Sequence, residues 1–282
     1  MRIFYAIAMP KVLIKNRFIL LIIPLLVCAV LVGWFFYPPA SEEAAAELPS
    51  AETLSTTYSF AELFAQGQYY FNHDDDPAGP YDIFTAKKYY EAAILNDPKG
   101  SPIVWYQLGR IDFILGNSEA ALYRFAKQIE YFGEEVPNVY YMLGLTHGFK
   151  ARQTGNAEDW ERGAEAFSRF IEFEPAEPWP RVDLAWIYFA QGKYAEMIPV
   201  LEIGLDHSPS NPWLLNMYGL ALLNTGEKDK ARIALLDAKR YAAELTPHDW
   251  GVAYSGNNPA DWERGLREFQ GYIDKNLALT EE

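Results

Sequence analysis

The chain has 282 residues, and half of them are hydrophobic, which is enough for a folded core and too apolar for general disorder. Its net charge is −14, but residues 1–37 carry four basic residues and no acidic ones, so residues 38–282 carry −18. Phosphate backbones repel so acidic a body, which excludes nucleic acid as an expected partner. The single cysteine, Cys28, excludes a disulfide framework and a zinc site built from several cysteines.

Residues 18–37 form an uncharged, apolar run that is long enough for a transmembrane helix. Lys11, Lys15 and Arg17 precede this run, and no further lysine or arginine occurs before Lys87. Positive charge collects on the cytoplasmic side, so residues 1–17 are expected to be a short basic cytoplasmic segment. We therefore expect a single-pass membrane anchor, with the acidic body on the extracytoplasmic side, periplasmic or extracellular.

The N-terminal segment leaves three questions open: whether it is cleaved, whether it pairs with a second copy, and where the chain starts. A cleaved signal peptide has a shorter apolar core with small residues directly behind it, whereas Ala44–Ala46 lie well beyond this run. We therefore favour an uncleaved anchor. Ala29 and Gly33 have the spacing that favours pairing of transmembrane helices, which makes homo-oligomerisation through the span an option. Met9 is an alternative start of the chain.

The spacer and the repeat region follow the anchor. Residues 38–57 are small, acidic and proline-bearing without apolar periodicity, and they predict a flexible spacer. From residue 58 to residue 278 apolar residues recur at helical spacing. Prolines open the expected helices at intervals of 35, 41, 34 and 35 residues, because a residue without an N–H is tolerated in the first turn. These prolines are Pro102, Pro137, Pro178, Pro212 and Pro247.

In the stretches that follow these prolines, a small residue comes directly after a leucine or a tyrosine. The steps are Leu108-Gly109, Leu184-Ala185 and Tyr218-Gly219, and large apolar residues recur at matching positions around them. These units resemble tetratricopeptide repeats, which are helix–turn–helix units of 34 residues. The resemblance implies an all-α fold, a tetratricopeptide-type α-α solenoid of about six helical hairpins, preceded by one N-terminal transmembrane helix. Irregular first and last units are typical of the ends of solenoids.

The pentapeptide DWERG occurs twice, at Asp159 and at Asp261, 102 residues apart, which is three times 34. Each copy follows an asparagine that is suited to cap a helix, and an aspartate in the first turn suits the helix dipole. We interpret the motif as the entry of a second repeat helix, with Gly163 and Gly265 at the crossing of the paired helices. A catalytic signature is the disfavoured alternative.

The resemblance also implies a groove along the first helices of the hairpins, in which such solenoids hold a protein or peptide partner. The carboxylate clamp of some chaperone-binding members needs several cations there, and only one is present. Aromatic anchors with a few amides suit an extended apolar peptide or a partner helix. The expected partner-binding residues are Tyr106, Arg110, Asn138, Tyr141, Trp179, Trp186, Trp213 and Asn216. The same face includes Ile103, Phe113, Leu145, Val182, Phe189 and Leu220.

Signals for catalysis, a cofactor or a metal are weak throughout. The four histidines are isolated from one another, and no phosphate-binding glycine loop or nucleophile motif occurs. The run His73–Asp76 has consecutive acids, which cannot all turn toward one cation, so a solvated turn is the favoured interpretation. We expect no enzyme activity, no catalytic residue, no cofactor and no metal.

The sequence therefore predicts a membrane-anchored scaffold or adaptor that binds a protein or peptide partner outside the cytoplasm. Envelope assembly, secretion or a pilus-like system would suit this architecture. A chaperone-like holdase in the periplasm is one alternative, and a glycan-binding module with an aromatic groove is another.

Overall fold

The computed structural model describes residues 45, 48–71, 80–254 and 257–281. The predicted anchor at residues 18–37, the basic segment before it and the acidic run His73–Asp76 lie outside this part of the chain. None of the helices found in the described residues has both the length and the apolar character needed to cross a bilayer.

Regular structure in the described residues is entirely helical, with thirteen α-helices and one short 3-10 helix. The elements in chain order are α3 (Ala51–Thr57), α4 (Phe60–Phe71), α5 (Ile83–Asn96), α6 (Pro102–Ile114), α7 (Ser118–Phe132), α8 (Pro137–Thr154), α9 (Ala157–Phe173), α10 (Trp179–Ala190), α11 (Tyr194–His207), α12 (Pro212–Asn224), α13 (Lys228–Ala242), α14 (Pro247–Ala253), η1 (Pro259–Asp261) and α15 (Trp262–Ala278). The predicted all-α class is confirmed for this part of the molecule.

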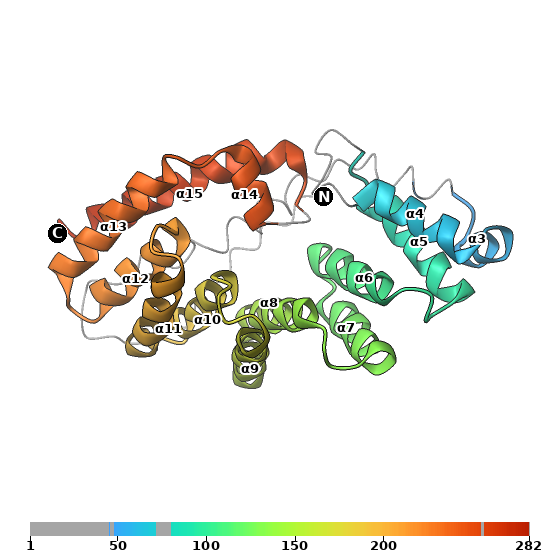
Figure 1. Cartoon of the computed structure of the whole chain (residues 1–282), viewed down its shortest axis with the longest axis horizontal. Coiled ribbons are helices and arrows are strands. Elements are labelled where there is room, and N and C mark those ends of the chain that lie inside the picture. Colours follow the sequence, from blue (N-terminus) through green and yellow to red (C-terminus); the bar gives the residue numbers. More distant parts are fainter. Residues whose placement is uncertain (1–44, 46–47, 72–79, 255–256, 282) are drawn as a thin grey trace.

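Consecutive helices pair into hairpins that follow one another along an arc (Figure 1). The pairs are α4 with α5, α6 with α7, α8 with α9, α10 with α11, α12 with α13, and α14 with α15. Buried apolar side chains form clusters that continue from hairpin to hairpin, as expected when each unit buries one face against its neighbours. The short helix α14 lies in the middle of the molecule, between the two arms of the arc (Figure 1).

Local sequence signals place the start of each first helix. Pro102, Pro137, Pro212 and Pro247 are the first residues of α6, α8, α12 and α14, and Pro178 directly precedes α10. The predicted proline positions are therefore confirmed.

Both copies of DWERG lie at the start of the second helix of a hairpin, α9 and α15. A Cβ added to Gly163 would lie 3.2 Å from the carbonyl oxygen of Gly144 in the paired helix α8. At Gly265 an added Cβ would lie only 2.3 Å from Cζ2 of Trp250 in the paired helix α14. The glycine of each copy thus allows two helices to approach closely, and the predicted structural role of the motif is confirmed.

The predicted spacer at residues 38–57 differs from the structure at its C-terminal end. Residues 51–57 form α3, whose N-cap is Ser50, with its side chain accepting a hydrogen bond from the backbone N–H of Thr53. Leu54 is buried in the cluster that α4 and α5 also form, and the ammonium group of Lys88 binds the carbonyl oxygen of Leu48 at 2.9 Å. One apolar residue without periodic partners was too weak a signal to predict this helix from the sequence.

Candidate functional site

A cavity with a volume of about 540 Å³ lies between the first helices of the middle hairpins and the segment around α14. We call it the central cavity, and its volume is in the range of sites that hold a small molecule or a few side chains of a partner. Its lining includes Tyr106, Arg110 and Phe113 of α6; Asn138, Tyr141, Leu145 and Phe149 of α8; Glu174 and Glu177 of the α9–α10 connection; Trp179, Val182, Asp183 and Trp186 of α10; Trp213 of α12; and Val252, Tyr254 and Asn257 of the C-terminal hairpin.

Helical periodicity directs the side chains of α10 into this cavity. Trp179, Val182, Asp183 and Trp186 are spaced by three or four residues and therefore share one face of the helix. The corresponding faces of α6 and α8 supply the neighbouring wall. The first helices of successive hairpins thus contribute equivalent stripes, as the repeat resemblance implied.

Seven of the eight predicted site residues line the central cavity: Tyr106, Arg110, Asn138, Tyr141, Trp179, Trp186 and Trp213. Asn216 is the exception, since its side chain is 3% exposed and does not reach the cavity. The Asn216 Oδ1 atom accepts a hydrogen bond from Nδ2 of Asn276 in α15 at 2.9 Å. The assignment of Asn216 to the groove is therefore corrected, and Asn216 is a core residue that joins α12 to the last helix. Partner binding by the other seven stays a prediction.

The aromatic rings of the lining contact one another in a continuous set. Trp179 and Trp213 meet edge to face with their centroids 4.9 Å apart, and Trp213 Nε1 donates a hydrogen bond to Tyr254 Oη at 3.1 Å. Phe149 and Trp186 lie 5.3 Å apart along the other wall. Because Trp186 and Trp213 are also buried in the core, these rings have a packing role as well as a surface in the cavity.

Asp183 carries a carboxylate in this aromatic lining. Its Oδ2 atom accepts a hydrogen bond of 2.6 Å from Tyr141 Oη. Burial raises the pKa of Asp183 to about 7, against the lowering effect of that hydrogen bond. Burial also raises the pKa of Tyr141 and of Tyr254, and the charge of Asp183 raises both further. All three groups are therefore neutral or close to half-ionised at neutral pH.

Arg110 of α6 is the one cation among the described residues that line the cavity. Its Nη1 atom donates to Gln107 Oε1 at 2.9 Å, and its guanidinium lies 5.0 Å from the ring centre of Phe71 and 5.7 Å from that of Tyr106. The guanidinium thus makes cation–π contacts with two rings, which arginine forms more often than lysine.

The sequence did not single out the C-terminal contribution to the cavity. Val252, Tyr254 and Asn257 belong to the last hairpin and its loop, and they face α8 and α10 from across the cavity. No local pattern predicts this closure, because it depends on how far the solenoid curves over four hairpins. The place of Asp183 in the lining could have been predicted from the sequence. It lies one residue after Val182 and three before Trp186, so helical periodicity puts it on the same face of the helix.

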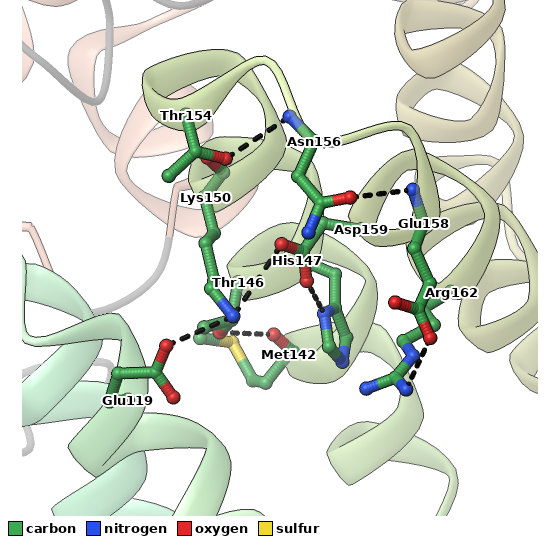
Figure 2. A network of polar contacts seen from close by, with 10 residues as sticks. All are labelled: Glu119, Met142, Thr146, His147, Lys150, Thr154, Asn156, Glu158, Asp159 and Arg162. Atoms are coloured by element: carbon green, nitrogen blue, oxygen red, sulfur yellow. Dashed lines mark hydrogen bonds and ion pairs between the residues drawn. The ribbon is translucent and has the colours of Figure 1, made fainter.

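A second polar cluster lies outside the cavity and uses the first DWERG copy (Figure 2). Asp159 is 2% exposed, and its Oδ1 atom lies 2.8 Å from His147 Nδ1. The ammonium group of Lys150 lies 3.5 Å from Asp159 Oδ2 and 2.9 Å from Glu119 Oε1 (Figure 2). The aspartate therefore links α9 to α8, and through Lys150 to α7. Within the described residues no group of three or more potential metal ligands occurs.

We expect Asp159→Asn to lower the free energy of unfolding by about 2 kcal/mol, because a buried, charge-assisted hydrogen bond and an ion pair lose their anion. The matched control is Asp261→Asn in the second DWERG copy, where the aspartate forms an ion pair with the partly exposed Arg264 at 2.6 Å. That change should cost less than about 1 kcal/mol. Urea denaturation of the two variants measures both values, and equal losses would contradict the assigned role of Asp159.

Comparison with known proteins supports the repeat assignment. Residues 182–244 match the family model of the tetratricopeptide repeat. A crystal structure of the MamA protein has a TM-score of 0.53 and 16% identity, and covers 70% of this chain and 95% of that chain. A second MamA crystal structure has a TM-score of 0.50 and 18% identity, with coverage of 58% and 90%. No curated protein matches the sequence. The described part of the chain is thus similar in fold to tetratricopeptide-repeat proteins.

Proposed function

We propose that this tetratricopeptide-type solenoid is a scaffold that holds an extended segment of a partner protein in the central cavity. The observation that carries the proposal is the cavity itself, about 540 Å³ in volume and lined by aromatic side chains of successive first helices. Aromatic anchors in a preformed concave surface give large contact area at a low cost in side-chain entropy. Polar groups in its lining, such as Asn138 and Asn257, suit the backbone of an extended chain.

A location for the solenoid is part of the same proposal. The uncharged run at residues 18–37 would anchor the protein in a membrane, and the basic residues before it would hold the N-terminus in the cytoplasm. The solenoid would then gather its partner on the extracytoplasmic side. Envelope assembly, secretion and pilus-like systems are the settings that such an anchored adaptor suits.

One experiment tests both the cavity and the location. Val252 lines the cavity and is 57% exposed, whereas Ile233 is 62% exposed and does not line it. The two residues are branched, apolar and matched in exposure. In a full-length chain with Cys28→Ser, either Val252→Cys or Ile233→Cys is labelled in intact cells with a membrane-impermeant maleimide that carries a photoreactive group. Illumination and mass spectrometry then identify what each position captures.

We expect both cysteines to be labelled in intact cells, and one defined partner segment to be captured from position 252 and not from position 233. Labelling that requires permeabilised cells would contradict the location. Equal capture from both positions would contradict the cavity as the docking site. Capture of many unrelated unfolded proteins would favour a holdase, and capture of polysaccharide would favour a glycan-binding module.

A further inference from the structure

The central cavity contains a buried carboxyl group that has no basic partner among the described residues. Asp183 lines it between Trp179 and Trp186 on the inner face of α10. Tyr141 supplies the hydrogen bond to this carboxylate, and no lysine, arginine or histidine of the described residues forms an ion pair with it. A carboxylate has about four acceptor positions on its two oxygens, so a single hydrogen bond leaves most of its capacity unused.

Other charged groups in the lining extend the negative character on the same side. Glu174 and Glu177, in the connection between α9 and α10, also line the cavity, so the described lining residues include three carboxylates and one cation, Arg110. That arginine belongs to α6, where Gln107 and two aromatic rings already contact it. The side of the cavity formed by α10 is therefore suited to a positive group.

Aromatic rings surround the carboxylate, which distinguishes this site from an ordinary acidic surface. Trp179, Trp186 and Trp213 line the same cavity, as do Tyr141 and Tyr254. The faces of such rings attract cations and also cover the methylene groups of a long basic side chain. Attraction by ring faces and by a desolvated carboxylate is stronger here than it would be in bulk water.

We propose that the central cavity contains a subsite for a lysine or arginine side chain of the partner segment, with Asp183 pairing the cation and the surrounding rings packing against its methylene stem. This inference rests on the proposed function and names the chemistry of the partner. An occupant with a neutral or acidic side chain at that place would bury Asp183 without a counter-charge, which is costly. The partner segment is therefore one basic residue flanked by apolar residues.

The probes are capped octapeptides with apolar flanks of alanine, leucine and phenylalanine, randomised in order, and a fixed central residue. Three sets carry lysine, arginine or norleucine, and norleucine matches the lysine stem without the ammonium group. Binding to the full-length protein in detergent is measured by fluorescence anisotropy at pH 8. We expect the lysine and arginine sets to bind at least tenfold more tightly than the norleucine set. In Asp183→Asn that preference should disappear while norleucine binding persists.

Two further variants test whether the lysine preference comes from Asp183 itself. One controls for the change of net charge, and the other changes the pKa of Asp183. Asp206→Asn removes one negative charge at an exposed position away from the cavity and should leave the preference unchanged. Tyr141→Phe keeps Asp183 but removes the hydrogen bond that it accepts from Tyr141. Because this hydrogen bond lowers the pKa of Asp183, its loss raises that pKa. The preference for lysine in this variant should then be lost at a higher pH than in the wild type as the solution is acidified.

The pH dependence is assigned to Asp183, whose pKa burial raises to about 7. The other titratable or charged groups among the described lining residues are the phenols of Tyr81, Tyr106, Tyr141 and Tyr254, the carboxylates of Glu174 and Glu177, and the guanidinium of Arg110. None of the described lining residues is a histidine. We expect the lysine preference of the wild type to weaken on going from pH 8 to pH 6, while binding of the norleucine set stays constant.

The outcomes distinguish this inference from the proposed function. Equal binding of the lysine and norleucine sets to the wild type would overturn the cationic subsite and leave the scaffold proposal in place. Binding of no peptide set would count against the scaffold proposal itself, and with it the subsite. If the free cation agmatine bound as tightly as the arginine set, the cavity would be a small-molecule site and the assigned protein partner would be wrong.

Discussion

Asp183→Asn should raise the free energy of unfolding by about 2–3 kcal/mol at pH 8 and leave it almost unchanged at pH 4. Burial disfavours the charged form of this carboxyl, and its pKa in the folded protein is about 7, against an ordinary value of 3.8. A difference of about three pKa units corresponds to roughly 4 kcal/mol, and the partial exposure of the side chain to the cavity lowers the expected value. Asparagine can still accept the hydrogen bond of Tyr141.

The sign of this effect follows from proton binding. Between about pH 4 and pH 7 the folded state keeps a proton on Asp183 that the unfolded state has lost, so its contribution to the free energy of unfolding falls as the pH rises. Urea denaturation of the wild type and the variant at pH 4.5, 6 and 8 gives the difference at each pH. Asp206→Asn, at an exposed site, is the control for a change of net charge. A variant less stable than the wild type at pH 8 would contradict a buried and unbalanced carboxylate.

Gly265→Val should destabilise the C-terminal hairpin by at least about 3 kcal/mol. A Cβ at this position would lie 2.3 Å from Cζ2 and 2.5 Å from Cε2 of Trp250, which is 1% exposed and has no room to move. The reciprocal contact has the same character, since a Cβ at Gly251 would lie 2.4 Å from the ring of Trp262. Overpacking of a core costs about 1–3 kcal/mol, and the β-branched side chain adds to it.

Gly271→Ala in the same helix is the matched control, because nothing lies within 4 Å of the added methyl group. It should stabilise the protein by about 0.5–1 kcal/mol through the higher helix propensity of alanine. Hydrogen exchange of α14 and α15, combined with urea denaturation, measures both changes. Gly265→Val within about 1 kcal/mol of the wild type would mean that the two helices do not pack as closely as the structure shows. Since Val252 and Tyr254 belong to this hairpin, its loss should also open the central cavity.

The repeat architecture could be predicted from the sequence because its determinants are local. A proline at the start of a first helix and a glycine at a helix crossing act within one or two turns, so Pro212 and Gly265 identify their own roles. The helix α3 was missed for a related reason, since it is stabilised by the contact of Leu54 with a distant helix pair and not by its own pattern.

Most of the candidate site also follows from periodicity, which places Trp179 and Trp186 on one face of α10. What could not be predicted depends on contacts between distant hairpins. Asn216 has the right register for the groove, but α15 supplies Asn276 as a buried partner and removes it from the cavity. Tyr254 lines the cavity only because the solenoid curves until its last hairpin faces α8.

The most direct test of partner binding in the central cavity is the identity of the residues that are crosslinked to position 252. We predict that a photoreactive group on Val252→Cys becomes attached to one short segment of a single partner, apolar on both sides of a lysine or arginine. The same group on Ile233→Cys, matched in exposure, should not reach that segment. An identical set of crosslinked proteins from both positions would contradict binding in the cavity.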